Sequence, residues 1–420
     1  MTPTPHGLPD ARDRRAPSAR AGARGLTGFS ALIVLALLVS RPAAAQEAPW
    51  PGTEWPKSTP AAQGMNGALF DSLDQAILNR RYAHVDRMVV VRNGYLVYST
   101  EYDRDYESIS HGVRSPLGCG IEACRDASEV HDYNYLHPSR HPWYQGRDVH
   151  TLQSVTKSVA ATVLGAAVHE GLIPSVEAPL LSYFQDYDLT DVDSRLNEVT
   201  LHDLLTMRSG IEWHEQDRPL DETNTTLQLE RSDDWIQFTL DQPMDASPGS
   251  RWVYNSGGSH LMSGIVRSAT GRYIDEYAEA SLFGPLGISE YHWKATPRGY
   301  PDTEGGLFME AEDLARIGLL YLRDGIWDGT RLLPEGWVAQ ATARQVERVN
   351  PAGWGYGYQW WRVDRGDTQV WAGLGFGGQF LLILPEHDIV GVINSWNVFG
   401  ANSSNVLMPF LDALIESVER

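Results

Sequence analysis

Ser154 and Lys157 form the only Ser-x-x-Lys sequence in the chain. Residues three positions apart on a helix project from the same face, so the hydroxyl and the amine would meet there. A serine hydroxyl is a weak nucleophile until a neighbouring group takes its proton. A buried lysine can take that proton once desolvation and nearby positive charge lower its pKa toward neutrality. The same pattern also fits a helix that begins with a capping Ser and carries a surface Lys.

Residues 154–169 (SVTKSVAATVLGAAVH) are mostly small and apolar, and Gly171 follows as a candidate C-terminal glycine. This composition predicts a helix that is buried on all sides. A serine in its first turn would lie at the positive end of the helix dipole, which favours negative charge on the oxygen. Lysine in such surroundings is costly without a role, and the chain has only Lys57, Lys157 and Lys294.

Strand-like segments lie toward both ends of the chain, and helix-like segments fill the middle. Residues 88–98 (MVVVRNGYLVY) predict a β-hairpin, because Asn93-Gly94 is a strong type I′ turn signal. Periodicity predicts further strands over 357–363, 369–372, 379–384 and 389–394, and helices over 65–80, 154–169, 201–208, 228–240, 257–269, 311–323 and 405–418.

This order of elements predicts an α+β fold in which one sheet is assembled from both termini and flanked by helices. The sheet region would comprise about 60–150 and 305–420, and a mostly helical region of about 151–304 would be inserted between them. Together they would form one domain over residues 46–420.

Residues 1–45 predict a cleaved secretory signal peptide. Residues 11–25 are rich in Arg, residues 28–40 form an apolar run too short to span a bilayer, and Ala43-Ala44-Ala45 supplies a small-residue cleavage site. A membrane-anchoring helix is the alternative interpretation. We therefore expect a periplasmic or secreted protein with no stable membrane insertion after the signal is removed.

Cys119 and Cys124 are the only cysteines, and they lie within an irregular stretch over residues 103–149. Two close cysteines in an exported protein most often form a local disulfide, so we predict one here. The histidines of this stretch (His131, His137, His141 and His150) have irregular spacing that does not indicate a metal site.

The formal net charge is −20, and removal of the Arg-rich signal would leave about −24. Such an acidic chain is poorly suited to binding nucleic acid or anionic lipid. The sequence has no Gly-x-Ser-x-Gly elbow, His-Glu-x-x-His zinc helix or phosphate-binding loop. We therefore expect a reaction carried out by Ser and Lys side chains, without a metal or cofactor.

Eight segments in order resemble the serine β-lactamase-like hydrolases, which include class C β-lactamases, D-alanyl-D-alanine carboxypeptidases, esterases and 6-aminohexanoate-dimer hydrolases. They are LQSVTKS (152–158), HDLLTMRSGI (202–211), PGSRWVYNSGGSHLMSGIV (248–266), FGPLGI (283–288), GGLFMEAEDLARIGLLYLRDG (305–325), LLPEGWV (332–338), WGYGYQWW (354–361) and GFGGQFLLILPEHDIVGVINS (375–395). The resemblance covers most of residues 65–415. It implies a β-lactamase/transpeptidase-like fold with an antiparallel sheet, and an acyl-enzyme on Ser154.

The second site element of that family is a Tyr-x-Asn motif after Pro-Gly and an aromatic residue. Here Pro248-Gly249 and Trp252 precede Tyr254, so the resemblance makes Tyr254 the proton shuttle beside Lys157. The third motif position is Ser256 instead of asparagine. Serine lacks the reach of an amide, which puts recognition of a substrate amide at this position in doubt.

The family's third element is a strand reading Lys-Thr-Gly or His-x-Gly, whose basic residue holds a substrate carboxylate. Its equivalent here is Gly373-Leu374-Gly375, which has no basic residue. By alignment the oxyanion hole would comprise the backbone N–H groups of Ser154 and Phe376, with Gly377 next to them. The glycines could equally form a bulge or a turn.

Without a basic anchor, hydrolysis of a carboxylic ester or a linear amide ranks above β-lactamase activity, with a small molecule or short peptide as substrate. Four tryptophans near the motifs could line an apolar acyl pocket: Trp252, Trp360, Trp361 and Trp371. One alternative is a penicillin-recognising D-Ala carboxypeptidase or β-lactamase. Another is a catalytically impaired protein that binds peptidoglycan peptides.

Overall fold

The computed structural model describes residues 49–110, 142–219, 221–350, 352–399 and 405–418. These residues all belong to one compact unit, which is separate from residues 1–47. The predicted signal peptide lies outside the described residues, as do Cys119 and Cys124 with their predicted disulfide. Both therefore stay predictions.

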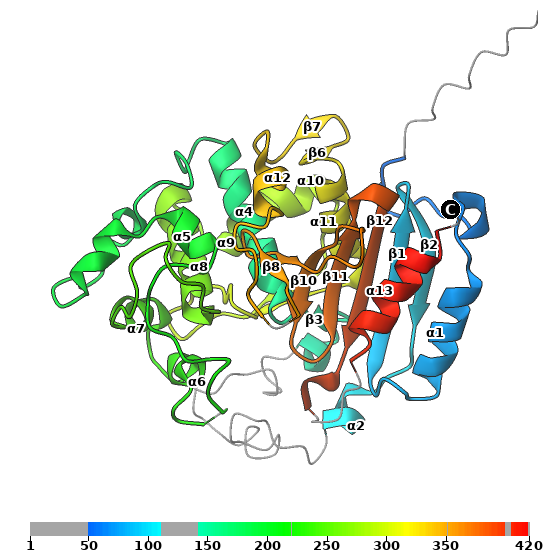
Figure 1. Cartoon of the computed structure of the whole chain (residues 1–420), viewed down its shortest axis with the longest axis horizontal. Helices are drawn as coiled ribbons and strands as arrows, with labels where there is room; N and C mark the ends of the chain where they lie inside the picture. Colours follow the sequence, from blue (N-terminus) through cyan, green and yellow to red (C-terminus); the bar gives the residue numbers. More distant parts are fainter. Residues whose placement is uncertain (1–48, 111–141, 220, 351, 400–404, 419–420) are drawn as a thin grey trace, which may run out of the picture. The chain divides into compact units, whose positions relative to one another are not determined.

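A seven-stranded antiparallel sheet forms the centre of the described unit, and its strands come from both ends of the chain (Figure 1). In spatial order the strands are β2 (Tyr95–Glu101), β1 (Val85–Arg92), β12 (Ile389–Ser395), β11 (Gln379–Leu384), β10 (Trp371–Gly375), β9 (Trp361–Arg362) and β8 (Gly355–Tyr356). β1 pairs with β12, so Val85 lies opposite Ser395. The predicted α+β class, with one sheet built from both termini, is confirmed.

Helices cover both faces of this sheet. α1 (Ala68–Leu78) and α13 (Leu407–Glu416) lie side by side on one face (Figure 1), where their apolar side chains share a core with β1, β11 and β12. On the other face, α11 (Ala311–Leu322) packs on β11 and β12. The long helix α4 (Val155–His169) packs on β10 of the same face and on the helical region beyond it.

The inserted region is mainly helical, as predicted. Its helices are α5 (Leu201–Leu205), α6 (Thr225–Glu230), α7 (Trp235–Leu240), α8 (Ser256–Thr270), α9 (Ile274–Ala278) and α10 (Gly284–Leu286). The remaining elements are α2 (Tyr106–Ser110), α12 (Trp337–Ala341), the small sheet of β3 (His150–Thr151), β5 (Leu307–Met309) and β4 (Tyr291–Trp293), and the pair β6 (Ile326–Trp327) and β7 (Thr330–Arg331).

The predicted hairpin over 88–98 is present, and both Asn93 (φ 52°) and Gly94 (φ 78°) have the positive φ that a type I′ turn needs. Two other elements were predicted to be longer and more continuous than they are. Of the strand predicted over 357–363, only Trp361–Arg362 is formed; before it lies Gln359, whose φ is 60° and whose N–H donates to Leu205 O at 2.9 Å. The helix over 228–240 is two helices, because the Asp234 side chain accepts the first amides of a new helix.

The chain reaches α4 through a tight turn after β3. Gln153 has a φ of 48° in that turn, which few residues other than glycine adopt. Every residue of α4 from Val155 to Ala167 is buried, as the composition predicted. Gly165 allows close packing, since a Cβ there would lie 2.5 Å from Trp337 Cε2. The turn and the packing together fix the start of α4 in space.

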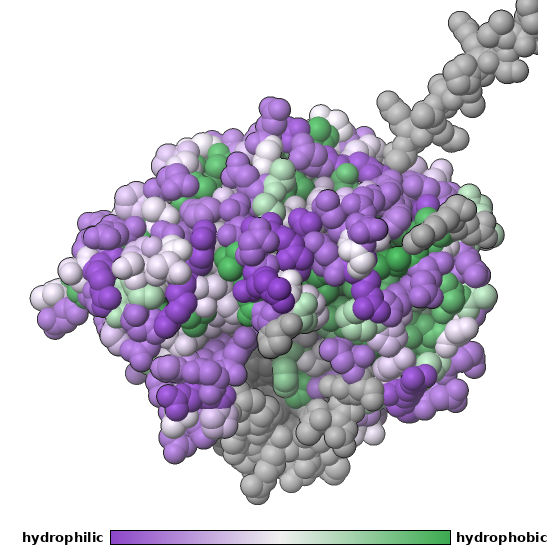
Figure 2. All heavy atoms as spheres, in the orientation of Figure 1, coloured by the Kyte–Doolittle hydropathy of each residue, from purple (hydrophilic) through white to green (hydrophobic). Residues whose placement is uncertain are grey.

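The surface in Figure 2 is dominated by hydrophilic residues, with hydrophobic residues scattered between them. This agrees with the acidic composition and its net charge of −20. Within the part of the chain that the structure describes, every helix is too short or too polar to cross a membrane.

Replacing Gly165 by Ala is expected to destabilise the protein by about 1–3 kcal/mol, because the added methyl group overlaps the rigid indole of Trp337. Chemical denaturation of the variant and the parent protein measures the difference. Gly67→Ala is the matched control, since Gly67 has a φ of −63° and its Cβ would meet only Pro60 at 3.4 Å. Equal stability of both variants would contradict the tight packing of α4.

Candidate active site

The structure brings Ser154, Lys157 and Tyr254 together. Ser154 directly precedes α4, and Lys157 lies in the first turn of that helix. Lys157 Nζ donates a hydrogen bond to Ser154 Oγ at 3.1 Å and lies 5.2 Å from the centre of the Tyr254 ring. Lys157 is 1% exposed and Tyr254 is 8% exposed. The amine and the phenol are therefore almost fully buried, and the hydroxyl of the half-buried Ser154 lies beside the amine.

Tyr254 is held by the start of α8. The Asn255 side chain accepts the N–H of Gly258 at 2.7 Å and so caps that helix. The preceding residue, Val253, donates its N–H to Met207 O at 3.0 Å. Trp361 stacks on the Tyr254 ring with a centroid separation of 5.9 Å. A capped helix, a backbone bond and an aromatic ring thus fix the phenol.

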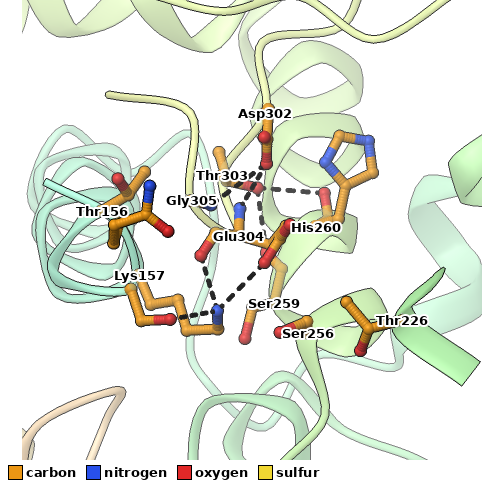
Figure 3. Close-up of polar contacts among 12 residues, drawn as sticks. Thr156, Lys157, Thr226, Ser256, Ser259, His260, Asp302, Thr303, Glu304 and Gly305 are labelled. Atoms are coloured by element: carbon orange, nitrogen blue, oxygen red, sulfur yellow. Dashed lines mark hydrogen bonds and ion pairs between the residues drawn. The ribbon is translucent and has the colours of Figure 1, made fainter. Parts of the chain in front are cut away.

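Lys157 has a strongly electronegative environment. Besides Ser154, its amine donates to Glu304 O at 2.5 Å and lies 3.4 Å from Glu304 Oε2 (Figure 3). Burial by itself would lower the pKa of Lys157, but the ionised forms of Tyr254, Glu304 and Glu215 raise its pKa overall. The condition under which a buried lysine becomes a base at neutral pH, positive neighbours that lower its pKa, is therefore not met here, because the groups that surround the amine are acidic.

Burial also raises the pKa of Tyr254, while the Lys157 charge and a hydrogen bond with Ser154 act in the opposite direction without cancelling it. At neutral pH the pair therefore consists of an ammonium and a neutral phenol. Neither form accepts a proton from Ser154. The pair has to release one proton before it can act as a base.

Ser256 is buried, with 1% of its surface exposed. Its N–H donates to Glu215 Oε2 at 3.0 Å, and its hydroxyl donates to Glu215 Oε1 at 2.8 Å. Trp213 Nε1 donates to the same carboxylate at 3.0 Å. The residue predicted to face a substrate is thus engaged by Glu215, a carboxylate that the sequence had not indicated.

The end of β10 lies against the turn that carries Ser154. A Cβ on Gly375 would lie 2.4 Å from Leu152 O, and one on Gly373 would lie 3.0 Å from Val155 Cγ1. Glycine is therefore required for this close approach. Gly377, with a φ of 79°, belongs to the turn between β10 and β11, as the alternative interpretation allowed.

The side chain of Phe376 is 57% exposed in the same turn. Its position next to the Ser154 turn is compatible with the predicted oxyanion role of its N–H, which stays a prediction. Of the four predicted tryptophans, Trp252 and Trp361 contact the Tyr254 ring. Trp360 is fully buried and donates to Tyr321 OH at 2.9 Å, and Trp371, on β10, packs against the main core.

Gln359 is a second residue that sequence reasoning missed. Its carbonyl accepts from Ser158 Oγ at 2.6 Å, its side-chain oxygen accepts from Ser259 Oγ at 2.8 Å, and its amide donates to Leu205 O at 3.1 Å. The main-chain carbonyl of Gln359 thereby bonds α4, and its buried side chain links α5 and α8. Its sequence signal was an amide among the aromatic residues of WGYGYQWW.

Among the described residues, no three His, Cys, Asp or Glu side chains lie close enough to hold a metal ion. His150, the only member of the predicted histidine group that is described, is buried. Its Nδ1 lies 2.9 Å from Thr151 O, and its ring packs on Trp396 at 3.8 Å.

Comparisons with known proteins find a matching family model and several similar proteins. The Beta-lactamase family model matches residues 88–415. The 6-aminohexanoate-dimer hydrolase of Paenarthrobacter ureafaciens is 27% identical over 272 residues, which cover 59% of this chain and 67% of that protein. The lovastatin esterase of Penicillium rubens is 25% identical over 180 residues, which cover 40% of this chain and 43% of that protein.

Among solved structures, a putative 6-aminohexanoate-dimer hydrolase from Bacillus anthracis superposes with a TM-score of 0.61. The two sequences are 22% identical, and the match covers 83% of this chain and 80% of the other. At this identity, the similarity shows that the two chains share a fold.

The rate at which Ser154 reacts with a fluorophosphonate is expected to rise with pH above neutrality. The raised pKa values of Lys157 and Tyr254 keep the pair fully protonated at lower pH, and only the pair that has lost a proton can accept one from Ser154. Labelling rates from about pH 6 to about pH 10 measure this, with Ser154→Ala as the blank. A rate that is flat or falls with pH would contradict the assignment.

Proposed function

Because this chain belongs to the Beta-lactamase family of serine hydrolases, we propose that it cleaves a carboxylic ester or a linear amide through an acyl-enzyme on Ser154. One observation carries the proposal: Lys157 Nζ lies 3.1 Å from Ser154 Oγ although the lysine is 1% exposed. A lysine that only covered the surface would extend its amine into water. Here the amine is held against the hydroxyl.

The proposed reaction begins when the Lys157 and Tyr254 pair, after releasing one proton, takes the proton of Ser154. Ser154 Oγ then attacks the carbonyl carbon of the substrate, and the backbone N–H groups of Ser154 and Phe376 hold the oxyanion. Tyr254 returns the proton to the departing oxygen or nitrogen. Water, deprotonated by the same pair, attacks the acyl-enzyme, and Ser154 regains its proton as the acid departs.

The charges around the site favour a substrate that is uncharged where the family usually binds a carboxylate. Gly373 occupies the position of the usual basic residue. Arg362, the last residue of β9, and Arg344 both pair with Asp364 at 3.0 Å. Glu215 adds negative charge beside Tyr254. The relatives point the same way, since one is named for cleaving an amide dimer and another is named an esterase.

The alternatives have less support. A peptidoglycan-peptide binder without catalysis has no need for the contact between Ser154 and Lys157. A penicillin-recognising carboxypeptidase or β-lactamase fits the family, but it would have to bind the carboxylate of its substrate without the usual basic residue. Acylation by a penicillin distinguishes this second alternative.

We also infer that the protein is exported to the periplasm or secreted, since residues 1–45 have the three parts of a signal peptide. The mature chain would begin near Gln46 and carry no stable membrane anchor. Intact mass measurement of the protein from the culture medium or periplasm is expected to show a chain that lacks these residues. A full-length chain retained in membranes would contradict export.

A fluorophosphonate probe is expected to label Ser154, and short p-nitrophenyl esters are expected to be hydrolysed. Ser154→Ala should abolish both, and Tyr254→Phe should lower kcat/KM about 10²–10⁴-fold because the proton shuttle is lost. Glu335→Gln, an exposed substitution outside the site, is the control and should retain activity. Peptide mapping identifies the labelled residue.

The same assay includes a fluorescent penicillin as a competitor. Little or no acylation by the penicillin, together with ester or amide turnover, supports the proposal. Rapid acylation of Ser154 by the penicillin would favour the carboxypeptidase or β-lactamase alternative. Turnover by Ser154→Ala equal to that of the parent protein would refute the acyl-enzyme.

A further inference from the structure

Glu304 contacts the catalytic amine in two ways. Its main-chain carbonyl accepts from Lys157 Nζ at 2.5 Å, and its carboxylate Oε2 lies 3.4 Å from the same atom. Figure 3 shows both contacts as dashed lines from Lys157. Glu304 is 5% exposed. Solvent therefore screens this ion pair only weakly.

We propose that Glu304 is a positioning residue for acyl transfer: its carbonyl and carboxylate hold the Lys157 amine against Ser154, and its charge sets the pH at which Lys157 and Tyr254 release their proton. The inference rests on the proposed function and deepens it. It assigns a role to a side chain that touches neither the nucleophile nor the Tyr254 ring in any recorded contact.

The loop that carries Glu304 is fixed without help from Lys157. Asp302 Oδ1 accepts the N–H of Glu304 at 2.9 Å and that of Gly305 at 3.2 Å. Thr303 Oγ1 donates to Ser259 O on α8 at 2.9 Å (Figure 3). Asp302 also pairs with Lys294 at 3.1 Å. Because the loop is anchored on two sides, Glu304 positions the lysine, and the lysine does not have to position Glu304.

Other titratable groups near this loop affect whether Glu304 is negatively charged. Burial and the Glu304 charge raise the pKa of Glu230, on α6, well above its ordinary value. Burial lowers the pKa of His260, on α8, to about 4, so its ring is neutral. Burial and the Asp302 charge also raise the pKa of Glu304, which Lys157 opposes. Of these two carboxyl groups, Glu304 has the contact with Lys157, which favours the negative charge on Glu304.

Farther groups add to the same field. Lys294 is paired with Asp302, and its charge lowers the pKa of Glu304. Glu215 contacts Ser256 and raises the pKa of both Lys157 and Tyr254, so it acts in the same direction as Glu304. Of these acidic side chains, Glu304 is the one whose carboxylate contacts the amine.

The charge of Glu304 raises the pKa of Lys157 and also that of Tyr254. Whichever of the two accepts the proton of Ser154, removing this charge moves proton release to lower pH. Losing the carboxylate contact also leaves the amine less firmly held. A neutral side chain at position 304 should therefore shift the pH profile toward acid and lower its plateau.

The test compares Glu304→Gln with Glu304→Asp and with the exposed control Glu335→Gln in the full chain. The pH dependence of fluorophosphonate labelling of Ser154 should move about 1–3 pH units toward acid in Glu304→Gln. Glu304→Asp keeps the charge, so its profile should stay near that of the parent protein with a lower plateau. Glu335→Gln should match the parent protein in both respects.

A second readout does not depend on the reaction. Tyrosinate absorbance, measured as the difference between each protein and its Tyr254→Phe counterpart, reports the ionisation of Tyr254. This ionisation should also occur at lower pH in Glu304→Gln. If Glu304→Gln does not fold, as judged by thermal unfolding, Glu304→Met replaces it with the same expected direction.

An unchanged pH profile and an unchanged Tyr254 titration in a folded neutral variant would overturn the inference and leave Glu304 a structural residue. Absence of Ser154 labelling in the parent protein at every pH would instead overturn the proposed function. The tyrosinate titration would then still decide whether the Glu304 charge acts on Tyr254.

Discussion

The site depends on one constraint, which is that an ammonium group on a side chain only 1% exposed has to be compensated without water. An unpaired charge in such a place would be strongly destabilising. The protein meets the constraint with Ser154 Oγ, the carbonyl of Glu304 and its carboxylate. The helix start, the anchored loop and the acidic surroundings all follow from that need. They also explain why the pKa of Lys157 rises although burial alone would lower it.

Close backbone approach is the second requirement, and glycines satisfy it. Gly165 lets α12 press on α4, and Gly375 lets β10 reach the turn before Ser154. Gly257 plays the same part at the start of α8, where a Cβ would lie 2.4 Å from Trp213 Cη2. Three elements distant in sequence thereby converge on one hydroxyl. Gln359 adds hydrogen bonds to α4 through its main-chain carbonyl and to α5 and α8 through its side-chain amide.

Local patterns in the sequence predicted what depends on neighbours along the chain: the Ser154 and Lys157 spacing, the buried helix α4, the hairpin at Asn93-Gly94 and the order of strands. What they missed depends on distant residues or on a single dihedral angle. Glu304 is 147 positions from Lys157, and nothing in its own segment shows which charge it meets. The acidic surroundings that raise the pKa of Lys157 also come from residues remote in the sequence. Gln359 and Asp234 each interrupted a predicted element through conformations that residue type alone does not reveal.

The pairing of β1 with β12 makes the fold rich in contacts between remote parts of the chain. Closing such a large loop is entropically unfavourable, so topologies of this kind fold slowly. During synthesis Ser154, Lys157 and Tyr254 emerge long before β10 and β12. A nascent chain thus contains these three side chains before it contains β10, which packs beside Ser154, and β12, which pairs with β1. The three side chains therefore acquire their final surroundings only after the C-terminal strands have been synthesised.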